Sequence, residues 1–223
     1  MSEWPFNPLE KGKYGAILAD PPWHFQPWVG GGGRWNGDKQ KPVYTPSRAP
    51  AYSTMSFEQI AALPVKDLIA SNAVLFLWGI WYYLPQALET ITAWGFEYKS
   101  CAFCWQKADI RQQDMFKEQY DGQWGLGYWT RQNSEFCLLA TRGSPKRLKA
   151  DIQQGIIAPR REHSRKPDGI HERIERLVAG PYCELFARQS RPGWDRWGNE
   201  TTKFDARAAC TTTAMRTTGR MLA

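Results

Sequence analysis

The sequence lacks a long hydrophobic run. Its longest apolar stretch, residues 73–84, ends before Pro85 and is shorter than the roughly 20 residues with which a helix crosses a bilayer. The first residues, MSEWPFNPLEKGKYG, contain no apolar segment of the kind found in a secretory signal peptide. We therefore expect a cytoplasmic protein that has no membrane partner.

Cysteine is scarce and scattered. The chain has five cysteines, an odd number, which favours reduced thiols in a cytosolic protein over a disulfide framework. Cys101 and Cys104 form a C-x-x-C pair, but no second pair follows at the spacing of a zinc site. Because both also fall in an expected strand, packing is their favoured role, and we expect no metal site.

Two motifs that would identify a binding function are missing as well. No glycine-rich G-x-G-x-x-G loop occurs early in the chain, and no helix-turn-helix or zinc-finger signature for reading a DNA sequence is found. The net charge of +7 in 223 residues nevertheless favours a polyanionic partner such as nucleic acid over a basic surface without one. Low sequence specificity is the corresponding expectation.

Apolar segments of strand length alternate with amphipathic helical segments. Helices are expected after Ser56, around Leu84 and after Pro167. The expected strands cover residues 14–20, 72–78, 96–107, 134–143 and 182–188. This alternation predicts an α/β fold with a parallel core in one domain, residues 1–200. Residues 201–223 have no apolar period and are expected to form a disordered tail.

The stretch LADPPWHF, residues 18–25, combines an acid, two prolines and a tryptophan at the end of a strand. Adenine's exocyclic amine is a poor nucleophile, so an enzyme that alkylates it must orient its lone pair with hydrogen-bond acceptors. Asp20 offers a carboxylate, and the Pro21 carbonyl, stiffened by Pro22, offers a second acceptor. Trp23 offers a face on which a base can stack. The alternative is a strand-ending turn with a packing tryptophan.

ADPPW resembles the signature of the methyltransferase-A family of adenine-N6 methyltransferases. The family comprises the messenger-RNA adenosine methyltransferase catalytic subunit and its bacterial and phage DNA relatives. The resemblance extends over about residues 15–200, and its motifs are specific only as an ordered set. In order they are YSTMS (52–56), VLFLW (74–78), EHSRKPDG (162–169), IERL (174–177), ELFAR (184–188) and WGNE (197–200).

The resemblance implies a single-domain, Rossmann-like methyltransferase sheet in permuted order, with the catalytic half first and the cofactor half last. It also implies S-adenosylmethionine as the methyl donor, with Lys166 and Arg188 at the donor's methionine end. Asn199 matches a ribose-binding position beside Glu200. Ser190 stands where eukaryotic members have a histidine. The expected catalytic residues are Asp20, Pro21, Pro22 and Trp23, and the expected cofactor-binding residues are Asp20, Lys166, Arg188, Ser190, Asn199 and Glu200.

The expected substrate-binding residues come mainly from residues 142–166, a stretch rich in lysine and arginine. Its prolines and glycines indicate loops, which favours contact with a phosphate backbone over a solvated helical face. A target amine inside a duplex is out of reach. Either the base must be flipped out of the duplex, or the substrate must be single-stranded. The expected substrate-binding residues are Arg147, Lys149, Arg160 and Arg161, with Tyr52 from the resemblance at the end of a lid loop.

The sequence therefore predicts an S-adenosylmethionine-dependent methyltransferase that acts on the N6 amine of adenine in DNA. Two alternatives stay open. The first is the same chemistry on RNA. The second is a catalytically inactive nucleic-acid-binding partner subunit, against which the retention of Asp20, Lys166 and Arg188 argues. The sequence leaves the oligomeric state undetermined, so a homodimer also stays open.

Overall fold

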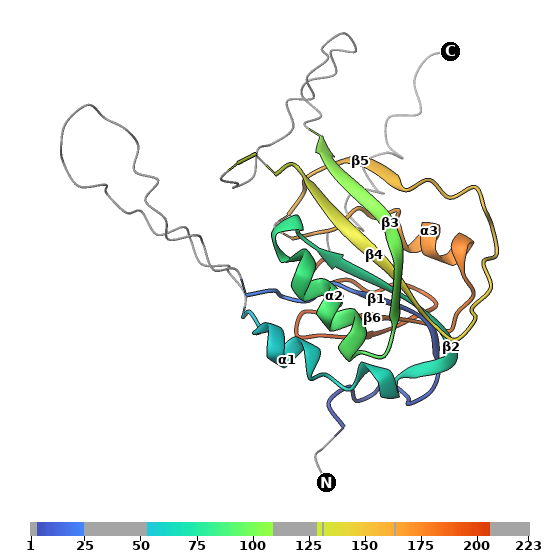
Figure 1. Ribbon diagram of the computed structural model, residues 1–223. Coiled ribbons are helices and arrows are strands. Elements are labelled where there is room, and N and C mark those ends of the chain that lie inside the picture. Colours follow the sequence, from blue (N-terminus) through green and yellow to red (C-terminus); the bar gives the residue numbers. More distant parts are fainter. Residues whose placement is uncertain (1–3, 25–52, 109–128, 131, 163, 206–223) are drawn as a thin grey trace, which may run out of the picture.

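A computed structural model describes residues 4–24, 53–108, 129–130, 132–162 and 164–205. In this part of the chain one sheet has the strand order β5-β3-β4-β2-β1-β6-β7 (Figure 1). The strands are β1 (Tyr14–Ala19), β2 (Ile69–Gly79), β3 (Glu97–Ala108), β4 (Ser134–Arg142), β5 (Gly155–Pro159), β6 (Tyr182–Leu185) and β7 (Trp194–Trp197). The helices are α1 (Phe57–Ala61), α2 (Leu84–Ala93) and α3 (Ile170–Leu177), with 3₁₀ turns η1 (Val65–Asp67) and η2 (Trp81–Tyr83).

Every strand of this sheet except β4 runs in the same direction. β1 pairs in parallel with β2 and β6, β7 is parallel to β6, and β5 is parallel to β3. β4 lies antiparallel between β2 and β3. One edge therefore collects the carboxyl ends of the other strands and the amino end of β4. We call it the carboxyl edge, where ligands of α/β sheets bind.

Helices cover both faces of the sheet (Figure 1). On one face, Leu75 of β2 packs with Ile60 of α1 and Ile91 of α2. On the other face, Phe76 of β2 packs with Ile174 of α3. The alternation of neighbouring strand residues between two apolar layers is what a strand buried on both faces requires.

Local sequence signals explain where the helices begin. Ser56 caps α1, and its hydroxyl accepts from the Gln59 backbone N–H at 3.2 Å while the Gln59 side chain accepts from the Ser56 N–H at 2.9 Å. This is the capping box that the sequence predicts. Proline lies in the first turn of α2, where its missing N–H has no helical partner to lose. No helix in the described part of the chain is long and apolar enough to cross a membrane.

The α/β class and the five expected strands are confirmed, and three details differ. The sequence does not predict β5 and β7, because each is short and is an outermost strand of the sheet. The core is mixed rather than wholly parallel, because β4 reverses. β6 ends at Leu185 rather than Arg188 because Phe186 adopts a φ of 61°, a left-handed conformation that ends a strand.

The described chain continues past the expected domain end at residue 200. Phe204 is buried, and residues 206–223 of the expected tail lie outside the described residues. Cys101 and Cys104 lie in β3, as expected. Among the described residues, no group of His, Cys, Asp or Glu is placed to hold a metal ion.

The fully buried Ile174 gives a test of the α3 packing. We expect Ile174→Ala to lower the free energy of unfolding by about 2–5 kcal/mol, because it leaves a cavity under the helix. Urea denaturation measures this. Glu172→Ala, on the exposed side of the same helix, should change the value by less than about 0.5 kcal/mol. Equal losses in the two variants would contradict the packing described here.

Candidate active site

Asp20 leaves the sheet at its carboxyl edge. Its backbone N–H donates to the Leu185 carbonyl at 3.4 Å, so the acid emerges where β1 and β6 end. The two prolines that follow hold a tight turn, in which the Trp23 N–H donates to the Pro21 carbonyl at 2.8 Å. One of the two lone pairs of that carbonyl is therefore used within the turn.

Trp23 fixes this turn onto its neighbours. Its indole N–H donates to the Trp78 carbonyl at 3.1 Å, and its ring centroid lies 5.9 Å from that of Phe57 in α1. The Met55 N–H donates to the Pro22 carbonyl at 3.0 Å, which adds a bridge between Trp23 and Met55. The tryptophan thus has a structural role in holding the DPPW motif, whatever it contacts in a complex.

Lys166 lies between two carboxylates. Its ammonium nitrogen is 2.9 Å from Asp20 Oδ2 and 3.2 Å from Glu135 Oε2. Lys107, at the end of β3, lies 2.5 Å from the other oxygen of Glu135. The four side chains are between 15% and 20% exposed, so the whole charged cluster is largely desolvated. We call these four residues the carboxyl-edge cluster.

Burial and pairing determine the protonation of the cluster. Burial raises the pKa of Asp20, and nearby Glu135 acts in the same direction while Lys166 opposes it. Burial also disfavours ionised Glu135, but Lys166 and Lys107 outweigh it and lower that pKa to about 2. Burial likewise disfavours the Lys166 cation, but the two carboxylates outweigh it and raise the Lys166 pKa. Glu135 is therefore ionised at neutral pH and faces a protonated Lys166, whereas burial favours the neutral form of Asp20 and Lys166 favours its carboxylate.

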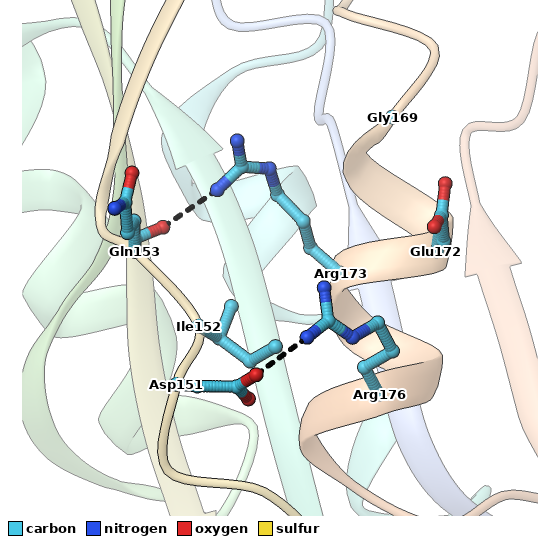
Figure 2. A pocket seen from close by; sticks show the side chains of 7 residues that line it. All are labelled: Asp151, Ile152, Gln153, Gly169, Glu172, Arg173 and Arg176. Carbon is cyan, nitrogen blue, oxygen red and sulfur yellow. Dashed lines mark hydrogen bonds and ion pairs between the residues drawn. The ribbon is translucent and has the colours of Figure 1, made fainter.

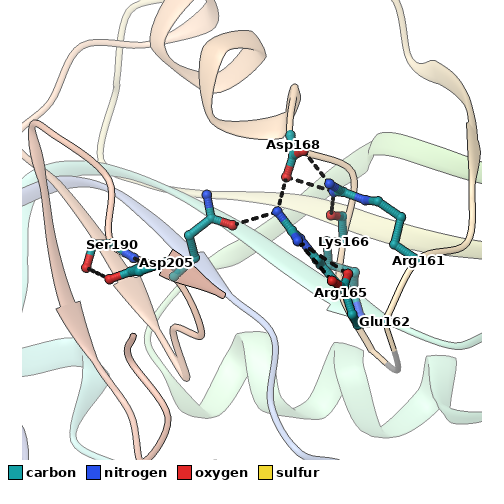
Figure 3. Close-up of polar contacts among 8 residues, drawn as sticks. Arg161, Glu162, Arg165, Lys166, Asp168, Ser190 and Asp205 are labelled. Atoms are coloured by element: carbon teal, nitrogen blue, oxygen red, sulfur yellow. Dashed lines mark hydrogen bonds and ion pairs between the residues drawn. The ribbon is translucent and has the colours of Figure 1, made fainter. Parts of the chain in front are cut away.

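The loop that carries Lys166 is braced by two arginines (Figure 3). Arg161 donates to both carboxylate oxygens of Asp168 and, at 3.0 Å, to the Lys166 carbonyl. Arg165, only 9% exposed, lies 3.2 Å from Asp168 and 3.3 Å from Glu162. Arg161 was expected to contact substrate phosphates, but in this arrangement its guanidinium holds the Lys166 loop.

Two nitrogens of Arg188 contact one carboxylate oxygen of Glu200 beyond the ends of β6 and β7. Arg188 Nε and Nη2 lie 3.0 and 2.9 Å from Glu200 Oε2. A hydrogen bond from Lys203, with the nearby Arg188 charge, lowers the pKa of Glu200. Asn199 is exposed on the same segment. The structure therefore brings together the residues expected at the donor's methionine end and ribose.

The segment after Glu200 packs over this region. The ring of Phe204 lies 5.0 Å from the guanidinium of Arg165 and 5.1 Å from that of Arg188. Ser190 donates to Asp205 through its backbone N–H, at 2.7 Å, and through its hydroxyl, at 2.5 Å. Ser190, an expected cofactor-binding residue, thus anchors the C-terminal segment (Figure 3).

The expected substrate-binding residues do not form one group. Arg160 is exposed just after β5, on the carboxyl edge. Arg147 and Lys149 follow the end of the reversed strand β4, and Arg147 forms a bridge with Val178 after α3. Both therefore lie at the opposite edge of the sheet, away from Asp20. Tyr52 lies outside the described residues.

A hollow of about 360 Å³ lies between α3 and the segment before β5 (Figure 2). Its arginines are engaged with that segment. Arg176 pairs with Asp151 at 2.8 Å, and Arg173 donates to the Gln153 carbonyl at 2.8 Å. These contacts tie the helix to the chain beside it, and none of the lining residues belongs to the carboxyl-edge cluster.

Sequence reasoning missed Glu135 and Lys107. Both lie in segments predicted as strands, and neither belongs to a motif that carries the resemblance. The available signal was positional: an acid that opens a buried strand is costly unless a cation pairs with it.

The indole N–H of buried Trp78 is a further polar group of the site. It has no hydrogen-bond partner among the described residues. Its ring lies 5.5 Å from the Lys166 ammonium.

A desolvated charged cluster at the carboxyl edge of an α/β sheet is typical of an enzyme's active site. Comparison with known sequences identifies its class more closely. The chain belongs to the MT-A70 family, whose model matches residues 14–200.

Curated relatives agree with this assignment. The chain is 28% identical over 208 residues to the type II methyltransferase M.MunI from Mycoplasma, a match that covers 87% of this chain and 81% of the relative. It is 26% identical to the human N(6)-adenosine-methyltransferase catalytic subunit METTL3, with coverage of 85% of this chain and 28% of the relative. A Drosophila MT-A70-like protein is 28% identical, with 85% and 27% covered. The chain therefore spans most of M.MunI but little more than a quarter of the eukaryotic relatives.

The depressed pKa of Glu135 predicts a pH-dependent contribution to stability. Since the folded value of about 2 lies below the ordinary 4.5, the stabilisation is present above pH 4.5 and is lost as the pH falls toward 2. This contribution of Glu135 to the free energy of unfolding is at most about 3 kcal/mol. Glu135→Gln should therefore be less stable than the wild type near neutral pH, with a difference that narrows in acid. Urea denaturation over this pH range measures the difference.

Glu97→Gln is the matched control, because Glu97 is a strand glutamate that is 78% exposed. Its difference from the wild type should stay small over the whole range. A wild-type minus Glu135→Gln difference that does not change with pH would contradict the pairing of Glu135 with the two lysines.

Proposed function

We propose that this protein transfers a methyl group from S-adenosylmethionine to the N6 amine of adenine in DNA. The observation that carries the proposal is the 2.9 Å contact between Asp20 and Lys166. It joins the DPPW motif after the first strand to the SRKPD motif far along the chain, at the edge of the sheet where ligands bind. Family membership gives this contact its chemical interpretation.

The residues at the carboxyl edge fit the methyl donor. When bound, S-adenosylmethionine supplies an electrophilic methyl carbon on a sulfonium. Lys166 and Arg188 are cations suited to its carboxylate, and Arg188 can bind a carboxylate in bidentate fashion. Glu200 and Asn199 carry polar groups suited to ribose hydroxyls. The unpartnered indole N–H of Trp78 adds a buried donor beside Lys166.

Asp20 would orient the substrate amine. Its carboxylate accepts one N–H, and the remaining lone pair of the Pro21 carbonyl accepts the other. The nitrogen lone pair then points at the methyl carbon, and positioning supplies much of the rate. As the new N–C bond forms, the bond between that carbon and the donor's sulfur would break and leave a neutral thioether, and the amine would lose one proton to the Asp20 carboxylate. Lys166 holds that carboxylate in place.

The order of the motifs supports the permuted arrangement that the resemblance implies. The catalytic DPPW motif follows β1, whereas Lys166, Arg188, Asn199 and Glu200 all come from the later part of the chain. We propose accordingly that residues 1–200 form one Rossmann-like methyltransferase domain with the cofactor half last. We also propose a cytoplasmic location, in keeping with the unpaired thiols of Cys137 and Cys183.

DNA is the favoured substrate because the chain is short, as in the bacterial and phage DNA members that its motifs resemble, and because it spans most of the type II methyltransferase M.MunI. The eukaryotic relatives, named as adenosine methyltransferases, keep RNA as the second candidate. One adenine-containing sequence offered as DNA and as RNA, each single- and double-stranded, distinguishes them. Methyl transfer to the RNA strands alone would reject the DNA assignment.

Asp20→Asn tests the role of the acid with little change in shape. We expect the turnover number to fall at least about 100-fold. Asparagine carries no charge, and its NH₂ group is a donor where the substrate amine needs an acceptor. Transfer of a labelled methyl group to DNA measures it, and calorimetry checks that the variant still binds S-adenosylmethionine.

Asp151→Asn is the matched control. Asp151 is also an ion-paired aspartate, but it lies beside α3, outside the carboxyl-edge cluster. Its turnover should equal that of the wild type. Undiminished turnover in Asp20→Asn would refute the role of Asp20, and a wild type that takes up no S-adenosylmethionine would favour an inactive nucleic-acid-binding subunit.

A further inference from the structure

Two exposed aromatic side chains lie next to each other where β2 ends. Trp81 is 42% exposed and Tyr82 is 59% exposed, and both belong to η2. Because β2 runs toward the carboxyl edge, η2 lies on the same edge as the charged cluster. Neither residue belongs to a motif already assigned a role.

Hydrogen bonds connect η2 to both halves of the candidate active site. The Trp81 indole N–H donates to the Ser134 hydroxyl at 3.0 Å, and Ser134 directly precedes Glu135 of the cluster. The hydroxyl of Tyr83, the last residue of η2, donates to the His24 carbonyl at 3.0 Å, directly after the DPPW motif. The turn that carries the two exposed rings is therefore attached to the chain segments directly next to Glu135 and to the DPPW motif.

Buried rings brace the exposed ones. Trp81 meets Phe136 of β4 edge to face, with centroids 5.1 Å apart and an interplanar angle of 70°. Tyr82 meets Tyr83 in the same manner, at 5.0 Å and 71°. Side chains held in this way lose little conformational freedom when a ligand binds. This rigidity is useful to a binding surface and unnecessary for an aromatic pair that contacts only water.

We propose that Trp81 and Tyr82 form a stacking platform for the nucleobases that flank the target adenine in the DNA strand. This inference rests on the proposed function. Bases stack on aromatic rings largely without regard to sequence, because every base has a π-face. The surroundings are polar: Ser134 is bonded to Trp81, and Arg160 is exposed on the same edge of the sheet. The chain as a whole carries a net charge of +7. That setting suits a polyanion with flat bases better than an apolar protein surface.

The experiment measures equilibrium binding of a labelled single-stranded DNA by fluorescence anisotropy, using the full chain. Trp81→Ala/Tyr82→Ala should bind about 10- to 100-fold more weakly than the wild type, whereas Trp81→Phe/Tyr82→Phe, which keeps two rings, should recover most of the affinity. In methyl transfer, the alanine variant should raise the KM for DNA and leave the KM for S-adenosylmethionine unchanged.

Tyr98→Ala is the matched control. Tyr98 is 45% exposed but lies near the start of β3, at the opposite edge of the sheet. The Tyr98→Ala variant should bind the DNA with the same affinity as the wild type. Circular dichroism checks that every variant keeps the fold.

A second DNA, with abasic sites in place of the bases that flank the target adenine, separates stacking from a merely structural role. The wild type should lose affinity for this DNA, and the alanine variant should bind both DNAs equally. Equal loss from the wild type and the variant would overturn the proposal, as would sedimentation showing that the rings join two copies of the chain. Because binding needs no methyl transfer, an inactive wild type would overturn the proposed function and leave this readout intact.

Discussion

The Lys166 ammonium, held between the carboxylates of Asp20 and Glu135, is the constraint on which the rest of the site depends. A lone desolvated charge costs several kcal/mol, so none of the three groups could occupy this position without the others. The ion pairs that Lys166 makes with the two carboxylates therefore bring together the end of β1, the start of β4 and the loop after β5. Lys166 thereby holds the Asp20 carboxyl group at the carboxyl edge, with the two side chains 2.9 Å apart.

A second group of contacts holds that constraint in place. Arg161 and Arg165 hold the Lys166 loop through Asp168, and Phe204 lies against both Arg165 and Arg188. The C-terminal segment therefore connects the proposed catalytic and cofactor-binding regions.

Much of this arrangement could be predicted from the sequence, and the rest could not be predicted for physical reasons. The capping box of α1 and the acid after β1 depend on neighbouring residues, so local patterns reveal them. Glu135 depends on a partner 31 positions away in the chain, Lys166, so no local pattern could assign it. Arg147 and Lys149 were expected near the substrate because their loop is basic, and only the reversal of β4 shows that they lie at the other edge.

The reversal of β4 also places one basic segment of the protein far from the candidate site. The strand has an acid near its first residue and a basic segment after its last, nine residues on, a span of about 30 Å for an extended chain. Fields in physiological salt decay over about 8 Å. In physiological salt this distant segment therefore adds little to the electrostatic potential at the carboxyl edge, where the proposed nucleic-acid strand would be held chiefly by the groups that it contacts.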